Sequence, residues 1–330
     1  MSLDRRAFLV TLTGSMLAAP LAAEAQQSAK MVQMRYLEFG WAGPGAPQFE
    51  AFRQGLRELG WLEGRNIAIV VRSSEGNENR LPESAADLVK LKVDLIFAST
   101  TPAALAAKQI ATTTPIVIGF VADPVGSGLV ASLARPGGNI TGWTHLAGVQ
   151  LNAKRIEILA QAVPGAVRIG ALWNPANPVH GPGLNEVEAA ARRLKLQLHS
   201  VGVRDPKELE GAFSQLAQQG VQALTVPPDG MFLGHDARII DLAAKYRIPT
   251  MYGVTELAKA GALMAYGTNL LEMYRRSAVF VDKILKGAKP GDLPIEQPTK
   301  FDLVINLKTA KAIGVSIPSS LLERADQLIE

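Results

Sequence analysis

Apolar runs alternate with amphipathic segments along almost the whole chain. Runs with the length of buried strands lie at 34–39, 67–71, 94–98 and 116–118. Segments with apolar residues at helical spacing lie between them, at 48–59, 82–91 and 102–110. Strands and helices that alternate with short connections are typical of a parallel sheet with helices on both faces. The sequence therefore predicts an α/β fold.

The same alternation begins again after Gly142. Further strands are predicted at 169–173, 197–201, 223–226, 250–252 and 263–265. Further helices are predicted at 154–162, 183–194, 206–219, 235–246 and 270–285. Two successive units predict two Rossmann-like lobes with parallel sheets, and a chain that crosses between them more than once makes a hinge. We assign 31–143 and 290–330 to the N-terminal lobe and 144–289, with the hinge crossings, to the C-terminal lobe.

The first 25 residues have the features of an export signal. Arg5 and Arg6 precede an apolar stretch that ends at Leu21, and Ala23-Glu24-Ala25 offers a cleavage site. That stretch is shorter than the ~20 apolar residues that a membrane-spanning helix needs. We expect a signal peptide at residues 1–25 that is cleaved before Gln26, export by a Tat-like or Sec route, and a periplasmic location.

Composition narrows the class of partner. The chain has 330 residues, 48% of them hydrophobic, and no cysteine, so its stability must come from an ordinary core. The net charge of +4 comes from scattered basic residues and not from a basic stripe, which argues against nucleic-acid binding. We expect a monomer that binds a small-molecule solute.

Ligands of open parallel sheets bind beyond the carboxyl ends of the strands, and polar or aromatic residues follow several of the predicted strands. At 99–101, hydroxyl side chains begin a predicted helix, which is either a simple cap or a cradle for a carboxylate. The other positions are likewise either turn and cap residues or ligand contacts. The candidate ligand-binding residues are Trp41, Ser99, Thr100, Thr101, Asp123, Asn174, Asp229, Tyr252 and Tyr266.

Signatures of catalysis are weak. The four histidines lack the spacing of a metal site, and we expect most of them at the surface. Gly126-Ser127-Gly128 resembles a dinucleotide-binding loop, but it follows the fourth strand and no acidic residue follows at the required distance. We expect no catalytic residue, no metal and no cofactor, although an enzyme is not excluded.

Several long motifs carry a family resemblance. They are GLRELGWLEGRNI at 55–67, ADPVGSGLVASLARPGGNITG at 122–142, LWNPANP at 172–178, FVDKILKGAKP at 280–290, DLPIEQPTKFDLVINLKTAKAIGVSIP at 292–318 and LLERAD at 321–326. With them the chain resembles the ABC transporter substrate-binding protein family that includes tryptophan- and tyrosine-binding members. The resemblance implies the type I periplasmic-binding-protein fold, three crossings between the lobes, and a ligand cleft between them.

The resemblance also implies a role as the extracytoplasmic solute-binding component of an ABC importer, with a membrane permease and its ATPase as partners. We expect closure of the two lobes to bury an amino acid or another small carboxylate. Its carboxylate would bind at 99–101, its amine near Asp123 or Asp229, and its apolar part against Trp41 and Tyr252. A ligand-binding sensor and an exported α/β enzyme are the alternatives.

Overall fold

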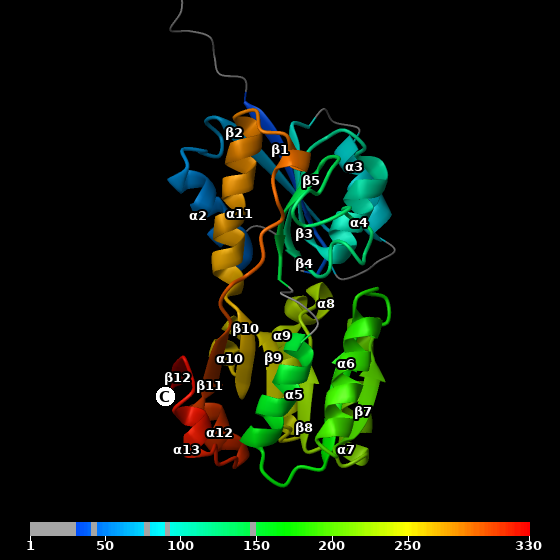
Figure 1. Ribbon diagram of the computed structural model, residues 1–330, viewed down its shortest axis with the longest axis vertical. Coiled ribbons are helices and arrows are strands. Elements are labelled where there is room, and N and C mark those ends of the chain that lie inside the picture. The colour runs from blue at the N-terminus through cyan, green and yellow to red at the C-terminus, as the bar shows by residue number, and fades with distance from the viewer. Residues whose placement is uncertain (1–30, 41–44, 76–79, 90–92, 146–149) are drawn as a thin grey trace, which may run out of the picture.

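The computed structural model describes residues 31–40, 45–75, 80–89, 93–145 and 150–330 (Figure 1). The predicted signal peptide at 1–25 and Trp41 lie outside these ranges. No helix within them is both long and apolar enough to cross a membrane.

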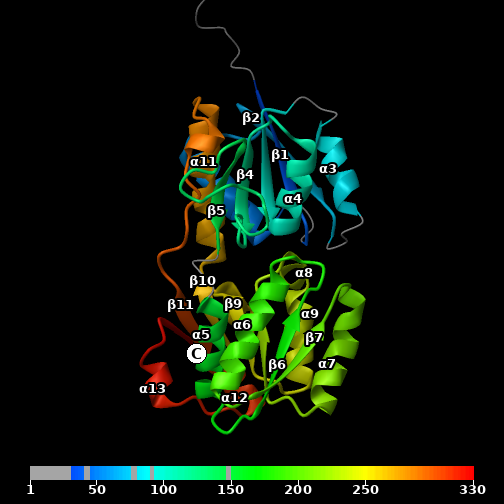
Figure 2. The same ribbon diagram turned by 45° about the vertical axis from the view of Figure 1, so that its right-hand side comes forward.

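The first lobe contains a five-stranded sheet of order β2-β1-β3-β4-β5, in which all pairs are parallel. Its strands are β1 (Val32–Glu38), β2 (Ile67–Ser73), β3 (Leu95–Thr100), β4 (Ile116–Val121) and β5 (Ile140–Thr144). Its helices are α2 (Pro47–Glu58), α3 (Leu81–Val89), α4 (Thr101–Ile110) and α11 (Leu270–Leu285), with the short helix η4 (Pro290–Asp292). Helices α2 and α11 lie on one side of the sheet, and α3 and α4 lie on the other (Figures 1 and 2).

The second lobe contains a seven-stranded sheet of order β12-β11-β10-β9-β8-β6-β7, in which only the β10–β11 pair is antiparallel. Its strands are β6 (Arg168–Trp173), β7 (Gln197–Gly202), β8 (Ala223–Val226), β9 (Thr250–Val254), β10 (Met264–Thr268), β11 (Asp302–Asn306) and β12 (Gln327–Ile329). Its helices are α5 (Gln150–Ala162), α6 (His180–Arg193), η3 (Pro206–Glu208), α7 (Leu209–Gln218), α8 (Gly230–Gly234), α9 (Asp236–Lys245), α10 (Glu256–Ala260), α12 (Leu307–Ile313) and α13 (Ser319–Leu322).

The two lobes repeat one topology. If the strands of each lobe are numbered along the chain, both sheets have the order 2-1-3-4-5, and β11 and β12 extend the second sheet. Doubly wound sheets of this order bind ligands beside the first strand, where the strand order reverses. The carboxyl ends of both sheets point toward the junction between the lobes (Figure 1). The predicted α/β fold with two Rossmann-like lobes is therefore confirmed.

The predicted lobe boundaries are wrong at the C-terminal end. Helix α11 packs against α2 of the first lobe, where Arg275 forms a 2.7 Å ion pair with Glu58 and Trp61 donates a 3.0 Å hydrogen bond to Asp282. Strands β11 and β12 belong to the second sheet. The segment 270–289 therefore lies in the first lobe and 302–329 in the second, the reverse of the assignment made from the sequence, whereas 290–292 lies in the first lobe as assigned.

The chain crosses between the lobes from β5 to α5, from β10 to α11 and from η4 to β11, as the family resemblance implies. Two of these crossings run side by side, because the Thr144 amide donates to the Glu296 carbonyl (3.0 Å) and the Glu296 amide donates to the Gly142 carbonyl (2.9 Å). The Arg276 guanidinium lies 4.5 Å from the ring centroid of Trp143 and 3.4 Å from the Glu296 carboxylate. Two of the three crossings are thus hydrogen-bonded to each other, and Arg276 links them to α11.

The lobes touch on the side of β1. Gly40, just beyond β1, lies so close to α8 of the second lobe that a Cβ atom placed on it would overlap the carbonyl oxygen of Gly230. A Cβ atom on Gly234 would in turn overlap the carbonyl oxygen of Gly40. The backbones of the two lobes are thus in contact here, and we call the arrangement of the lobes with this contact the closed one.

Candidate ligand-binding site

Two adjoining cavities lie between the lobes. The smaller, of about 540 Å³ including its open mouth, lies at the carboxyl ends of β6 and β8 beneath α5 and α6. The larger, of about 1130 Å³, is lined from the first lobe by the 123–127 loop and from the second by α6. Asn152, Val179 and Gly183 line both. The cavities therefore form one cleft that both lobes enclose.

The smaller cavity is lined by a group of apolar side chains and by a group of polar side chains, which we call the polar rim. Its apolar side chains include Ala171 and Leu172 from β6 and Leu184 and Val187 from α6. Its polar side chains are His145, Asn152, Arg155 and His180, together with Thr225 on β8. A cavity of this kind suits a ligand with an apolar body and a polar head.

Arg155 is the main charged group of the rim. Its side chain is buried, and its guanidinium donates hydrogen bonds to the carbonyl of Tyr266 (2.9 Å), the amide oxygen of Asn152 (2.9 Å) and the carbonyl of Gly253 (3.5 Å). All three acceptors are neutral. Burial lowers the pKa of Arg155 to about 10, so the group stays charged near neutral pH. No carboxylate in the described part of the chain lies within ion-pair distance of this cation.

The sequence analysis did not single out Arg155, although a signal for it exists. Helix α5 buries Leu151, Ile158, Leu159 and Ala162 at helical spacing, and Arg155 occupies the same face. Arginine is seldom buried without a carboxylate partner. A single arginine within an apolar stripe could therefore have indicated a site on this helix.

Two of the histidines line the smaller cavity, and the expectation that most histidines lie at the surface is wrong for them. The His145 ring stacks on Phe120 at 4.0 Å, and burial lowers its pKa to about 3, which keeps it neutral. His180 Nδ1 accepts a 2.9 Å hydrogen bond from the Asn174 amide, so its Nε2–H faces the carbonyl of Pro228 at 3.3 Å. Within the described ranges no group of histidines and acidic residues could hold a metal.

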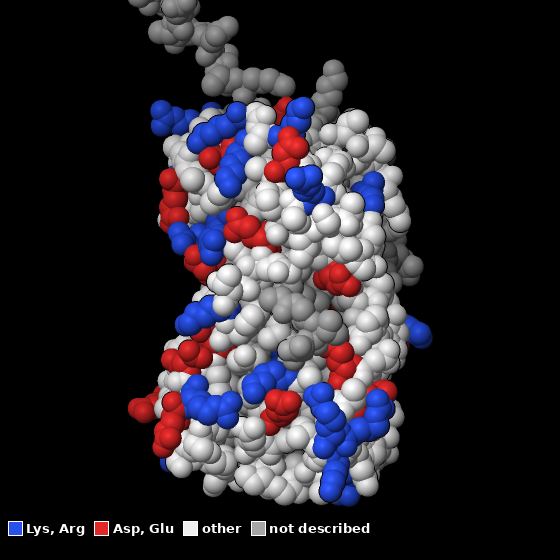
Figure 3. All heavy atoms as spheres, in the orientation of Figure 1, with Lys and Arg blue, Asp and Glu red and all other residues white. Residues whose placement is uncertain are grey.

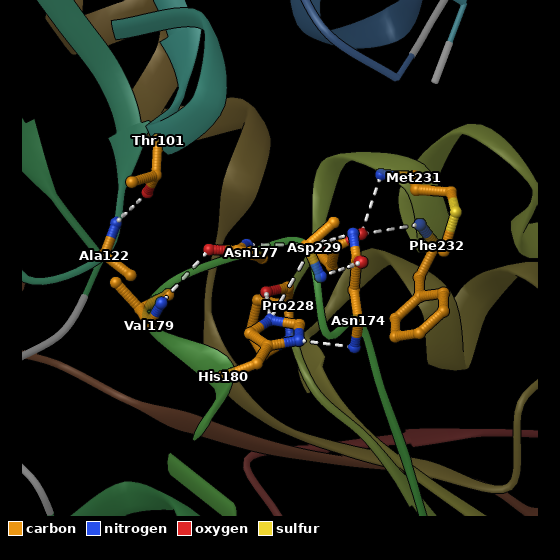
Figure 4. A network of polar contacts seen from close by, with 11 residues as sticks. Thr101, Ala122, Asn174, Asn177, Val179, His180, Pro228, Asp229, Met231 and Phe232 are labelled. Atoms are coloured by element: carbon orange, nitrogen blue, oxygen red, sulfur yellow. Dashed lines mark hydrogen bonds and ion pairs between the residues drawn. The ribbon is translucent and has the colours of Figure 1, made fainter. Parts of the chain in front are cut away.

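Asn174 and Asp229 lie together at the ends of β6 and β8 (Figure 4). The buried Asp229 carboxylate caps α8 through the amides of Met231 (2.9 Å) and Phe232 (3.3 Å). It also accepts hydrogen bonds from the side-chain amides of Asn177 (2.9 Å) and Asn174 (3.4 Å). Both oxygens of this carboxylate accept hydrogen bonds from the protein itself. Of the two interpretations made from the sequence, the helix cap therefore describes Asp229, and the contact with a ligand amine does not.

The predicted hydroxyl cradle begins α4. Thr101 Oγ1 accepts a 3.0 Å hydrogen bond from the Ala122 amide and so ties α4 to the end of β4 (Figure 4). The hydroxyls of Ser99 and Thr100 are buried, and neither finds a hydrogen-bond partner among the described residues. Thr100 is the N-cap residue of α4, but its hydroxyl makes no capping hydrogen bond, and its methyl group lies near Gly230 across the junction.

Asp123 lines the larger cavity and lies at the surface of the first lobe. Its backbone is in the left-handed region (φ 37°), and its carboxylate accepts a 2.8 Å hydrogen bond from the Gly126 amide. A side chain at Gly126 would overlap that carboxylate, and Gly128 also has a positive φ of 72°. The glycines that resemble a dinucleotide-binding loop therefore serve a tight turn.

The predicted tyrosines have different environments. Tyr252 on β9 is buried, its hydroxyl has no hydrogen-bond partner in the described ranges, and burial raises its pKa well above the usual value. Tyr266 on β10 is half-buried with its ring centroid 6.4 Å from that of Phe301, and its carbonyl accepts from Arg155.

Among the described candidates, Asp123 lines the larger of these two cavities, and the others are not part of the lining of either. The polar rim instead comes from α5, α6 and the hinge. Lys and Arg are interspersed with Asp and Glu on the face that Figure 3 displays, in keeping with the absence of a basic stripe in the sequence.

Comparisons with known proteins agree with this architecture. Residues 46–329 match the family model described as ABC transporter substrate binding protein. The chain is 26% identical over 266 residues to the tyrosine-binding protein of Clostridioides difficile, which covers 81% of this chain and 76% of that protein.

Solved structures show the same fold. A conserved domain protein from Vibrio cholerae superposes with a TM-score of 0.82 at 25% identity, over 91% of this chain and 100% of that one. The ABC domain in complex with L-Trp from Streptococcus pneumoniae gives 0.81 at 24% identity, with the same coverage. The ligand-free, open structure of a substrate binding protein with adhesive properties from Clostridium difficile gives only 0.60 at 25% identity, over 91% of this chain and 99% of that one.

The match to the family model covers most of the chain and both lobes. The chain belongs to the ABC transporter substrate binding protein family.

Proposed function

We propose that the protein is the extracytoplasmic solute-binding component of an ABC importer and captures a small carboxylate, such as an amino acid, between its lobes. The observation that carries this proposal is Arg155, a buried cation in the cleft that only neutral groups contact. Relatives named for tyrosine binding and for a complex with L-Trp support the amino-acid class.

The physical argument rests on desolvation. A buried charge without an opposite partner is costly, and a ligand carboxylate would supply the missing charge through charge-assisted hydrogen bonds. The apolar side chains that line the same cavity would contact the rest of the ligand. Because both lobes line the cleft, only the closed arrangement would complete these contacts.

The importer role also accounts for the expectations about export, location, oligomeric state and partners that were made from the sequence. The chain would be exported by its signal peptide, act as a periplasmic monomer, and deliver the solute in its closed form to a permease that works with an ATPase. We propose no catalytic role for it. The candidates at 99–101, Asp123, Tyr252 and Tyr266 would contribute as secondary contacts or as supports of the cleft.

The test is a thermal-shift screen of the chain from Gln26 to Glu330 against amino acids and other small carboxylates. A compound at 100 times its dissociation constant should stabilise the fold by about 2.7 kcal/mol, which raises the midpoint by a few degrees. Arg155→Lys should weaken binding of each hit about 10- to 100-fold, because lysine cannot reproduce the planar guanidinium.

Arg168→Lys is the matched control, because Arg168 also donates to a backbone carbonyl, that of Gly220 at 2.8 Å, but does not line the cleft. The proposal is wrong if no carboxylate in the panel binds, or if Arg155→Lys binds the hits as tightly as Arg168→Lys does.

A further inference from the structure

A carboxylate without a direct ion-pair partner among the described residues lies close to Arg155. Glu186 on α6 is half-buried, lines the larger cavity, and forms no ion pair with any described cation. Its carboxylate accepts a 3.4 Å hydrogen bond from Asn152 Nδ2. Burial raises the pKa of this carboxyl to about 7, because its neighbours compensate the charge only in part.

Asn152 keeps the two charges apart. Its Oδ1 accepts from Arg155 at 2.9 Å, and its Nδ2 donates to Glu186 at 3.4 Å. The guanidinium and the carboxylate are therefore separated by one amide group and two hydrogen bonds, and their attraction offsets the effect of burial on the pKa of Glu186 only in part. Asn152 itself lines both cavities, so this row of groups borders the open space of the cleft.

The order of charges along this row is complementary to one class of ligand. An α-amino acid carries a carboxylate and an ammonium group on the same carbon, and a cation and an anion that face it with a short gap can bind both ends at once. The other carboxylates near the cleft are engaged within their own lobes, since Asp229 caps α8 and Asp123 holds the amide of Gly126.

We propose that Arg155, Asn152 and Glu186 form a head-group site for a zwitterionic α-amino acid, with the ligand carboxylate at Arg155 and its ammonium group at Glu186. The proposal rests on the proposed function and specifies it further. The apolar side chain of the ligand then enters the cavity lined by Leu172, Leu184 and Val187. This places the ammonium group on α6, in contrast to the positions near Asp123 or Asp229 expected from the sequence.

The site is tested by removing one charge of the ligand at a time. Isothermal titration calorimetry compares L-tryptophan with 3-(indol-3-yl)propionate, and L-tyrosine with 3-(4-hydroxyphenyl)propionate, on the chain from Gln26 to Glu330. Each propionate lacks only the ammonium group. Glu186→Gln should weaken an amino acid about 10- to 100-fold, because a charge-assisted hydrogen bond is lost, and should leave its propionate unchanged.

Glu188→Gln is the matched control, because Glu188 lies on the same helix but pairs with Arg192 at 3.7 Å and does not line the cleft. Circular dichroism and the unfolding midpoint establish that both variants fold. Should a variant not fold, the comparison of the ligand pairs on the unmutated protein decides alone.

Two results overturn the head-group site and leave the proposed function intact. One is a propionate that binds the unmutated protein as tightly as its amino acid. The other is an equal loss of affinity for both members of a pair in Glu186→Gln. If none of the four compounds binds, the site is wrong as well, and the wider carboxylate panel then decides separately on the proposed function.

Discussion

Gly40→Ala should open the protein. The added Cβ atom would overlap the carbonyl oxygen of Gly230, which is backbone of the other lobe and cannot rotate away as a side chain could. The overlap is relieved only when the lobes separate or the backbone shifts. Overpacking of this kind costs about 1–3 kcal/mol.

The cost falls on the closed arrangement alone, because the overlap is with the second lobe. The closed population relative to the open one should therefore drop about 5- to 150-fold, and the apparent ligand affinity should drop by up to the same factor. Small-angle X-ray scattering of the free protein should report a larger radius of gyration, and calorimetry with L-tryptophan should report the weaker binding.

Gly211→Ala on α7 is the control, because a Cβ atom there meets open space and the residue is far from the junction. It should leave both measurements unchanged. The reasoning is refuted if Gly40→Ala has the scattering profile and the affinity of the unmutated protein, since contact at Gly40 would then not be what holds the lobes together.

Three further predictions concern stability. Thr101→Val removes the 3.0 Å hydrogen bond to the buried Ala122 amide and should lower the free energy of unfolding by about 1–2 kcal/mol in urea denaturation; an unchanged value would mean that water replaces the hydroxyl. Because the pKa of Glu186 is raised in the folded state, the protonated carboxyl favours folding, and the free protein should lose stability as the pH rises from 4.5 toward about 7. Glu186→Gln should reduce that loss. Equal unfolding midpoints of the two proteins at pH 8 would contradict this prediction. Trp61→Phe removes the 3.0 Å hydrogen bond to Asp282 and should cost about 0.5–1.5 kcal/mol, and a variant as stable as the unmutated protein would show that this bond does not anchor α11.

The sequence predicted the positions of most helices and strands better than it predicted which of them pack together. Buried runs such as 94–98 and amphipathic runs such as 48–59 are determined by local periodicity, and both are found where predicted. Helix α11 has an equally clear periodicity, but an apolar face does not specify which lobe it covers. Strand β5 was not predicted, since Gly142, with a φ of 135°, interrupts its pattern.

The candidate site was likewise predicted in part: its position in the fold was found from the sequence, and its polar side chains were not. The rule that ligands bind at strand ends located the cleft, because both sheets point their carboxyl ends at the junction. It could not find Arg155, Asn152 and Glu186, because these lie on helices, and their proximity depends on how α5 packs against α6. Asp229 was predicted as a ligand contact because it follows a strand, but its carboxylate caps α8 instead.

Late segments of the chain complete both lobes, which has a consequence for how the chain folds. Helix α2 in the first lobe is covered by α11, more than 200 positions later in the sequence, and the second sheet is complete only when β11 and β12 have been added. Neither lobe is a continuous stretch of chain, so the first can reach its final packing only after α11 has been synthesised, and the second only after β12. Such long-range closure is slow, and a chain that ends near residue 290 would keep the first lobe but leave β10 as an unprotected sheet edge.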